Sequence, residues 1–260
     1  MFDPTELLTP ENSEILRDEI LPEALHMDHG WQFVVGDPEI YENMDRLLVP
    51  AGKALDVGIG LARSSLCLAL NGMVVEGFDL DKERVEIING WRDKGVPISA
   101  EVKDITNCRF GRDKYDTTIF SQTFIHFPNT ELAYKVMKKG IAATKVGGHI
   151  YLRTVGTLDS MYSDHEECGL YPTEAERSKA DPNVIYDWCG CSGEPRFDPH
   201  LFLNPFNLMV FLTGNGIKIV YSQTAPQYGE KNVMYGENWH TPVSYYEQCG
   251  MITLIGEKVR

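Results

Sequence analysis

The sequence predicts an α/β fold, in which helices cover a mostly parallel sheet. The strongest observation is one unit early in the chain, where an apolar run at Ala54 and Leu55 ends at Asp56. A turn with two glycines follows, then a helical segment at 62–70 and a second apolar strand at 74–78. A strand, a helix and a strand in this order make a β-α-β unit, whose two strands lie parallel. Helices are also expected over 38–48 and over 82–94, the latter with Asp81 as its cap. Further apolar strands recur between the helical segments, so the predicted sheet extends well beyond this unit.

The turn of this unit, with Gly58 and Gly60, predicts a ligand site. Glycines at the carboxyl end of the first strand allow the backbone to approach a ligand closely. The second strand ends at Asp79, and an acid at that position can bind two ribose hydroxyls. The unit therefore predicts a site for a cofactor that contains a nucleoside.

The residues around the glycines indicate which kind of nucleoside cofactor fits. A dinucleotide site requires G-x-G-x-x-G, which places a pyrophosphate at a helix N-terminus, but Arg63 replaces the third glycine. Asp56 lies two residues before Gly58, where a carboxylate repels a phosphate and attracts a cation. These residues favour a cationic cofactor over a dinucleotide. An NAD-type or nucleotide-sugar enzyme is the alternative.

The run Asp56-x-Gly58-x-Gly60 closely resembles the first motif of class I S-adenosyl-L-methionine (SAM) methyltransferases, whose cofactor carries a sulfonium and an ammonium group. Later segments resemble the rest of that family in the same order, over residues 34–256. They are the strand 98–102 with Asp104, the strand 115–121 with the loop His126-Phe127-Pro128, the Gly147-Gly148 turn in the segment 145–153, the helix after Phe197-Asp198-Pro199, and the strands 217–220 and 251–255.

This resemblance implies a Rossmann-like class I methyltransferase fold. Such a fold has a seven-stranded, mostly parallel sheet with helices on both faces, here with an inserted lid after strand five. Residues 1–260 would form a single methyltransferase domain. The resemblance also implies that Asp56 lies near the methionine end of the cofactor, Asp79 at the ribose and Asp104 at the adenine amino group. The full set of predicted cofactor-binding residues is Asp56, Gly58, Ile59, Gly60, Arg63, Asp79, Leu80, Asp104, Ile105 and Ser121.

The stretch 58–72 is most similar to the tellurite-resistance and thiopurine type of small-molecule methyltransferase. Those enzymes often carry G-x-G-x-x-R-x-S-x-x-L-A-x-x-G here, and Arg63 falls on the arginine of that pattern. The chain departs from it in having Ile59 and Leu61 beside the second glycine. The similarity implies transfer of a methyl group from SAM to a small-molecule acceptor by in-line displacement. The alternative is a SAM-binding protein of the same fold with a regulatory role or another reaction.

The acceptor decides whether such an enzyme needs a general base. A hydroxyl or an amine must lose a proton, and histidine is the usual base near neutral pH. A thiolate or a chalcogen oxyanion is already ionised. The resemblance places His126 near the transferred methyl group, so it is the candidate catalytic residue, with a hydrogen bond to local backbone as its structural alternative. His165, His200 and His240 are weaker candidates.

Three segments lie outside the predicted sheet. Residues 1–33 form an N-terminal extension with one helix, and the aromatic side chains of Trp31 and Phe33 pin it to the core or fold over a ligand. The acidic segment 156–196 is longer than ordinary connections and leaves strand five at the ligand-binding end, so it is the predicted substrate lid. Its acidity favours a neutral or cationic acceptor. The aromatic-rich segment 222–250 is the predicted second substrate-side loop.

Composition excludes several classes of partner. A formal net charge of −14, from 38 acidic and 24 basic residues, disfavours nucleic acid. No apolar stretch reaches the length of about 18 residues that a membrane span needs. The first residues lack the basic and apolar regions of a signal peptide, and the six cysteines do not resemble a disulfide framework. A reducing, cytoplasmic location is therefore expected. The sequence predicts no particular oligomeric state.

Several soft ligands lie in or beside the acidic segment and raise the question of a metal site. Four such side chains could bind zinc tetrahedrally. The spacing of Cys189 and Cys191 is tighter than the usual Cys-x₂₋₄-Cys, however. The other pair, His165 and Cys168, lies far from them in the sequence. The prediction is that no metal is bound by His165, Cys168, Cys189, Cys191 or His200 and that the three cysteines are free thiols.

Overall fold

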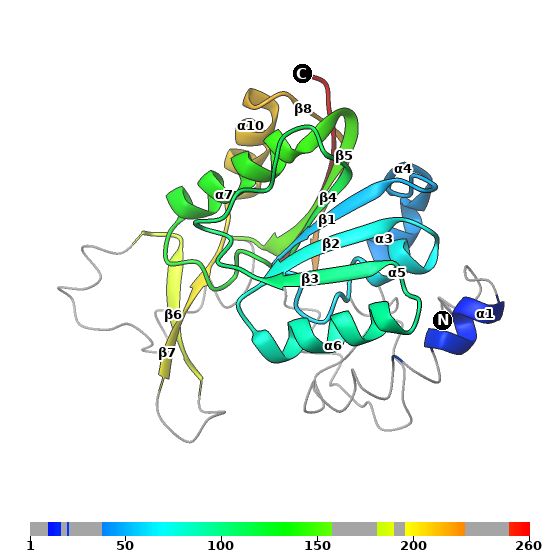
Figure 1. Cartoon of the computed structure of the whole chain (residues 1–260). Coiled ribbons are helices and arrows are strands. Elements are labelled where there is room, and N and C mark those ends of the chain that lie inside the picture. Colours follow the sequence, from blue (N-terminus) through cyan, green and yellow to red (C-terminus); the bar gives the residue numbers. More distant parts are fainter. Residues whose placement is uncertain (1–9, 17–19, 21–37, 158–180, 190–195, 227–249) are drawn as a thin grey trace.

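A computed structural model of the chain describes residues 10–16, 20, 38–157, 181–189, 196–226 and 250–260 (Figure 1). Its centre is a seven-stranded sheet with the order β3-β2-β1-β4-β5-β9-β8. β9 pairs antiparallel with both of its neighbours, and the pairs among β1 to β5 are parallel. The predicted sheet is thus confirmed. The strands are β1 (Lys53–Val57), β2 (Val74–Asp79), β3 (Ile98–Val102), β4 (Tyr115–Ser121), β5 (Thr144–Val155), β8 (Ile217–Pro226) and β9 (Gly250–Lys258).

The strand order reverses between β1 and β4, which are neighbours in the sheet although two strands separate them in the sequence. Asp56 of β1 is paired with Gly77 of β2 on one side and with Ile119 of β4 on the other. The connections that follow two such neighbouring strands run in opposite directions and leave a crevice between them. Ligands of open α/β sheets bind in this crevice. The fold therefore places a binding site beyond the carboxyl ends of β1 and β4.

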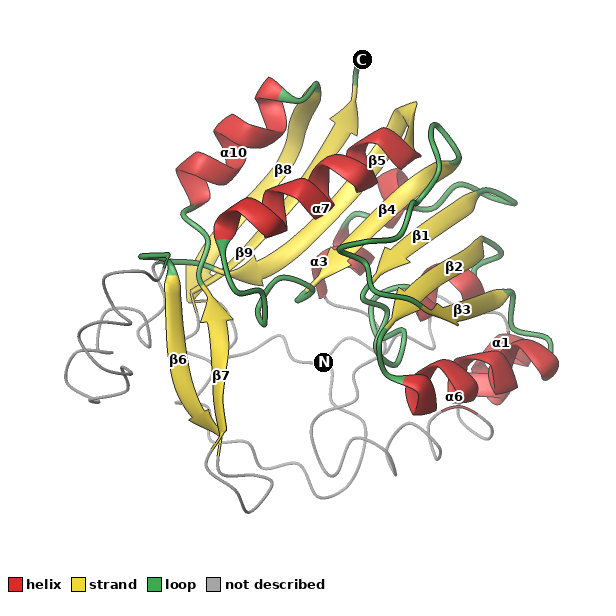
Figure 2. Cartoon of the chain, turned by 60° about the vertical axis from the view of Figure 1, so that its left-hand side comes forward, coloured by secondary structure: helices red, strands yellow, loops and turns green. Residues whose placement is uncertain are grey.

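Helices cover both faces of the sheet, as the resemblance implied (Figure 2). Two separate apolar clusters form the core, because each face is buried against its own helices. One face carries α3 (Pro38–Glu42), α4 (Met44–Leu47), α5 (Leu66–Leu70) and α6 (Lys82–Asp93), and the other carries α7 (Thr130–Ala143) and α10 (Pro205–Gly214). A further short helix, α1 (Pro10–Ile15), donates a hydrogen bond from Asn12 to the carbonyl of Leu70 over 2.5 Å.

The two longest described helices, α6 and α7, begin where the sequence supplies a capping side chain. Asp81 accepts hydrogen bonds from the backbone N–H groups of Glu83 and Arg84, at 3.0 and 3.2 Å, and so begins α6. Asn129 does the same for α7 through the N–H of Leu132 at 2.8 Å. Trp91 is fully buried on the inner side of α6. The predicted helix over 82–94 is therefore present, with Asp81 as its cap.

Two helical predictions were wrong in their bounds. The helix expected at 62–70 begins only at Leu66, because Ala62 has a φ of 56° and residues up to Ser65 form turns. The helix expected over 38–48 is split into α3 and α4 at Asn43. Neither change moves the glycine turn, since both fall outside it.

The chain after β5 contains a second sheet that the sequence did not predict. β6 (Val184–Cys189) and β7 (Arg196–Leu201) pair antiparallel, so 197–199 lies in a strand and α10 begins only at Pro205. Figure 2 shows this hairpin extending away from the main sheet on the side where β5 ends, in agreement with the bridge between Gly156 and Leu203. Residues 158–180 and 190–195 of the predicted lid lie outside the described residues, and its role as a lid stays a prediction.

The base of the β6–β7 hairpin is tied to the chain that follows β4. The N–H of Leu201 donates to the carbonyl of Ile125 over 2.8 Å. Asp181, just before β6, accepts a hydrogen bond from the N–H of Thr130 over 2.7 Å. These bonds hold the two ends of the hairpin, before β6 and at the end of β7, beside the loop that carries His126.

The remaining predicted segments are described only in part. Trp31 and Phe33 lie outside the described residues. The predicted loop at 222–250 begins as strand, since β8 continues to Pro226, and 227–249 lies outside the described part. Among the described residues, no helix is long and apolar enough to span a membrane.

Candidate functional site

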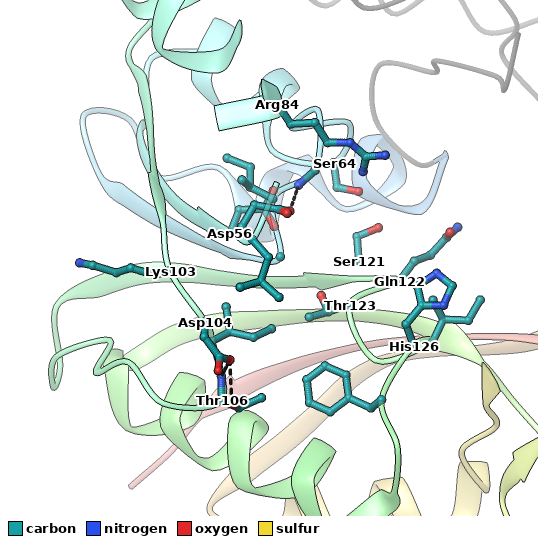
Figure 3. Close-up of a pocket in the computed structure, with 18 of the residues that line it drawn as sticks. Asp56, Ser64, Arg84, Lys103, Asp104, Thr106, Ser121, Gln122, Thr123 and His126 are labelled. Carbon is teal, nitrogen blue, oxygen red and sulfur yellow. Dashed lines mark hydrogen bonds between the residues drawn. The ribbon is translucent and has the colours of Figure 1, made fainter. Parts of the chain in front are cut away.

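A cavity of about 570 Å³ opens at the carboxyl ends of β1, β2 and β4 (Figure 3). Its volume lies within the range of about 300–1,000 Å³ that is typical of small-molecule sites. The loops after β1, β2, β3 and β4 all contribute to its wall. All ten predicted cofactor-binding residues and His126 line it, although their individual roles stay predictions: Asp56, Gly58, Ile59, Gly60, Arg63, Asp79, Leu80, Asp104, Ile105, Ser121 and His126.

The glycine turn after β1 is held close to β2. The N–H groups of Gly58 and Ile59 both donate to the carbonyl of Phe78, at 2.9 and 3.0 Å. Gly58 has a φ of 76°, and a Cβ added there would lie 3.0 Å from the methyl group of Thr123. The Thr123 hydroxyl donates to the carbonyl of Val57 over 2.6 Å. A side chain at position 58 would therefore be strained, and its absence leaves bare backbone on the cavity wall.

Asp79 is fixed at the tip of β2 by two backbone groups. One carboxylate oxygen accepts a hydrogen bond from the N–H of Gly60 at 2.7 Å, and the other accepts from the N–H of Asp81 at 2.9 Å. Each carboxylate oxygen can accept a second bond. The side chain is therefore oriented in advance and retains acceptor capacity for a pair of hydroxyls.

Asp56 lies deeper in the cavity, where only 2% of its surface is exposed. A carboxylate removed from water is costly unless hydrogen bonds or a positive charge compensate it. It lies at the end of β1, beside the glycine turn, where an ionised carboxylate would suit a cationic group.

Asp104 organises the turn that follows β3. One carboxylate oxygen accepts from the N–H and the hydroxyl of Thr106, at 2.8 and 2.6 Å, and the other accepts from the Asn107 amide at 2.6 Å. The N–H groups of Asn107 and Cys108 donate to the Asp104 carbonyl, at 3.1 and 2.9 Å. The hydrogen bonds from Thr106 are the main cause that lowers the pKa of the Asp104 carboxyl below its usual value. Asp104 is therefore ionised at neutral pH and can accept a bond from an amino group.

Two basic residues of the cavity, Arg84 and Lys103, were not predicted from the sequence. Arg84 forms an ion pair with Asp81, with 3.2 Å between its Nε and the carboxylate. Lys103 lies 2.8 Å from the carboxylate of Glu101 and 5.0 Å from the centre of the Phe78 ring. Both follow soon after strands whose carboxyl ends reach the cavity, and that position is the signal that could have identified them.

The other side of the cavity is built by residues 122–128, the β4 exit loop. Gln122 has a φ of 54°, and its N–H donates to the carbonyl of Arg153 over 2.7 Å. A left-handed backbone is unfavourable for a residue other than glycine and is often found at functional sites. This loop therefore adds a strained position to the cavity wall, beyond the predicted Ser121 and His126.

His126 lies across the cavity from Asp104 and is exposed (Figure 3). Its ring meets the ring of His200 from β7 edge to face, with 5.4 Å between the ring centres. Among the described residues its ring makes no hydrogen bond, so the local backbone bond considered for it is not observed. The structure thus brings two of the predicted histidines together, while His165 and His240 lie outside the described residues.

The side chains that were considered as possible metal ligands lie largely outside the described residues. Nothing is described for the side chains of His165, Cys168, Cys189 or Cys191. Within the described ranges, no group of three histidine, cysteine or acidic side chains is placed to hold a metal ion. Cys67 is buried, and its thiol lies 3.3 Å from the carbonyl of Ser64, in agreement with the role of a small core residue.

Comparison with known proteins gives one family and many structures. A family model described as "Tellurite resistance protein TehB" matches residues 33–170. No curated protein matches the sequence.

Several solved structures share the fold. A SAM-dependent methyltransferase from Methanosarcina mazei superposes with a TM-score of 0.63 at 17% identity, covering 86% of this chain and 99% of its own. The magnesium protoporphyrin IX methyltransferase of Synechocystis, solved with bound SAH (S-adenosylhomocysteine), gives 0.55 at 15% identity, covering 85% and 78%. The [4+2]-cyclase SpnF gives 0.53 at 15% identity, covering 83% and 78%. At these identities the structures establish the fold.

Proposed function

The chain belongs to the tellurite resistance protein TehB family of SAM-dependent methyltransferases, and from this premise we propose that it methylates a small-molecule acceptor bound beside the β4 exit loop. The family match covers more than half of the chain, residues 33–170 of 260. It confirms the resemblance to class I methyltransferases of the tellurite-resistance type, with SAM as the cofactor. The acceptor and the roles of the individual residues are what we propose.

The residues of the cavity fit this cofactor. The observation that carries the assignment is the carboxylate of Asp79, held by the N–H groups of Gly60 and Asp81 and facing the same cavity as Asp56 and Asp104. Asp79 would bind the ribose hydroxyls and Asp104 the adenine amino group. Asp56, almost fully buried, would compensate the positive charge at the methionine end. The bare backbone at Gly58 would allow the cofactor to lie against the turn.

The β4 exit loop would hold the acceptor. SAM supplies an activated methyl group, which the acceptor takes as the carbon–sulfur bond breaks. The contribution of the protein is to hold the two reactants in line and to exclude water. His126 lies on the acceptor side and would orient the acceptor or, if the acceptor is protonated, take its proton.

The charges of this loop favour an acceptor that is already ionised. The segment 121–128 contains no acidic residue, while the three acids of the cavity belong to the predicted cofactor side. An anionic nucleophile bound beside His126 would therefore not be repelled by a carboxylate of that loop. The acidity of 156–196 favours a neutral or cationic acceptor instead, and most of that segment lies outside the described residues. A thiolate or a chalcogen oxyanion is the acceptor class that we propose.

Methyl transfer can be tested directly with SAM that carries an isotopically labelled methyl group. The protein would be incubated with tellurite, selenite, small thiols and, as contrasting acceptors, small amines and alcohols. Mass spectrometry should find label on a chalcogen or a sulfur atom, and the Asp79→Ala variant should form far less product. Label on nitrogen or oxygen alone would overturn the proposed acceptor class.

A second outcome would favour the alternative function. Since the [4+2]-cyclase of similar fold shows that this architecture hosts other reactions, the protein could bind SAM without transferring its methyl group. Calorimetric binding of SAM, with no labelled product from the acceptors or from a whole metabolite extract, would support that alternative.

A further inference from the structure

Lys139 of α7 does not line the cavity, yet it contacts the turn that carries Asp104. Its ammonium group donates to three backbone carbonyls of that turn. The distances are 3.3 Å to Ile105, 2.7 Å to Thr106 and 3.0 Å to Cys108. An ammonium group has three donors, so this one side chain is saturated by a single turn of backbone.

These carbonyls need a donor that the turn does not itself provide. The side chain of Asp104 satisfies N–H groups and the hydroxyl at the beginning of the turn, through Thr106 and Asn107. Lys139 instead satisfies backbone carbonyl groups of the turn, those of Ile105, Thr106 and Cys108. The positive charge of Lys139 also contributes to the lowered pKa of Asp104, after the larger effect of the Thr106 hydrogen bonds. The turn is therefore fixed from two sides, one local and one supplied by a distant helix.

The same lysine supports the tip of β2 through two aromatic rings. Its Nζ lies 5.8 Å from the centre of the Phe110 ring, and Phe110 stacks on Phe78 with 5.6 Å between ring centres. Phe78 precedes Asp79, and its carbonyl accepts the N–H groups of the glycine turn. Lys139 thus contacts Phe110, which packs on Phe78 next to Asp79, and it also bonds the turn that carries Asp104.

We propose that Lys139 is a positioning residue for adenine recognition, because it holds the 104–108 turn in the conformation that presents Asp104 to the adenine amino group. This inference rests on the proposed binding of the cofactor in the cavity. It assigns a specificity role to a residue outside the cavity wall. One oxygen of Asp104 accepts only the Asn107 amide among the bonds described, so it retains capacity for a further donor.

The test uses two ligands that differ at the base. S-adenosylhomocysteine carries the adenine amino group, and S-inosylhomocysteine has a carbonyl oxygen in its place, which a carboxylate repels. Calorimetry on the full chain should show that the wild-type protein prefers the adenosyl ligand by about tenfold to a hundredfold, the range of one hydrogen bond to a charged group. In Lys139→Met, which keeps the apolar stem, the preference should fall to about threefold or less. Affinity for the inosyl ligand should change by less than about threefold.

Two controls separate this role from a general loss of structure. Lys138→Met removes the neighbouring exposed lysine, whose Nζ lies 5.8 Å from the Phe211 ring, and should leave the preference unchanged. The double variant Asp104→Asn with Lys139→Met should lose no more preference than Asp104→Asn alone, because the lysine acts through the aspartate. If Lys139→Met does not fold, Lys139→Gln, which can still donate to the turn, should show an intermediate preference.

The possible outcomes separate this inference from the proposed function. An equal loss of affinity for both ligands in Lys139→Met, or an unchanged preference, would overturn the positioning role while leaving the cofactor site in place. A wild-type protein that binds both ligands equally would overturn it as well, since Asp104 would then not recognise the base. Failure of the wild-type protein to bind either ligand would overturn the proposed function itself.

Discussion

The two sides of the cavity are built in different ways. On the cofactor side, Asp79 and Asp104 are each fixed by hydrogen bonds of 2.6–2.9 Å from residues no more than nineteen positions away. On the acceptor side, the β4 exit loop is held by segments far along the chain, and the His126 ring is exposed. The cofactor side is thus organised before any ligand arrives. The acceptor side depends on how the region after β5 packs.

This difference predicts where substitutions will act. Changes on the cofactor side should alter SAM affinity strongly and largely independently of the acceptor. Changes on the acceptor side should leave SAM affinity almost untouched. Substitutions far from both should affect only the free energy of unfolding.

Asp79→Ala should give the largest effect. It removes a carboxylate that can accept two bonds from ribose, each worth about 1.5–3 kcal/mol, and releases the N–H of Gly60. SAM affinity measured by calorimetry should fall by about tenfold to several hundredfold. Glu83→Ala, which removes an exposed acid of α6 outside the cavity, is the matched control and should bind normally. Unchanged affinity in Asp79→Ala would remove this residue from the cofactor site.

Gly58→Ala tests the glycine turn. A φ of 76° and a contact of 3.0 Å with Thr123 strain any side chain there, at a cost of about 1–3 kcal/mol in the free energy of unfolding. Urea denaturation should show this loss together with weaker SAM binding. Gly90→Ala is the control, because a Cβ in the middle of α6 meets nothing within 4 Å. That variant should instead gain about 0.4–1 kcal/mol, and a similar result for both glycines would contradict the strained turn.

Glu76→Gln tests the ion pair between Glu76 and Lys114 in the middle of β2, outside the cavity. Burial acts to raise the pKa of Glu76, but hydrogen bonds from Lys114 and Tyr115 outweigh it and hold the pKa below its ordinary value of 4.5. Because the folded-state pKa is the lower one, this stabilisation is present above about pH 4.5 and is lost as the pH falls through the folded-state pKa. The variant should lose about 1 kcal/mol of stability at pH 7 and less near pH 3.

Denaturation curves at several pH values would measure this effect, with SAM affinity as the second readout. Affinity should be unchanged, since Glu76 does not line the cavity. A loss of stability that is equal at pH 3 and pH 7 would contradict the proposed ion pairing.

His126→Ala should give the smallest effect on binding. SAM affinity should stay within about twofold, because the ring lies on the acceptor side, across from Asp104 (Figure 3). With an ionised acceptor the variant should keep most of its turnover, and its rate should follow the ionisation of the acceptor. A loss of about 10²–10⁴ in turnover, with a wild-type rate that rises near pH 6–7, would instead identify His126 as a general base. His200→Phe keeps a ring against His126 and should reproduce the wild-type pH profile.

Most of the fold could be predicted because the deciding residues lie close together in the sequence. The β-α-β unit, the cap at Asp81 and the acids at the strand tips are local patterns that need no distant contact to be recognised. The bounds of the helix at 62–70 could not, since the positive φ of Ala62 belongs to a turn that packs against the sheet. The β6–β7 hairpin was missed because its strands lack a clear alternation of apolar residues.

The sequence by itself determined the sheet, the family and ten residues that line the cavity, although it did not indicate Arg84 and Lys103. It did so because glycines and acids at strand ends have few other uses at that spacing. Only the tertiary structure brought His200 to His126 and Lys139 to the 104–108 turn. Lys139 lies more than thirty positions from the carbonyls it contacts, on a helix whose placement depends on core packing. No local pattern encodes such contacts, because they arise when separate elements pack on the same sheet.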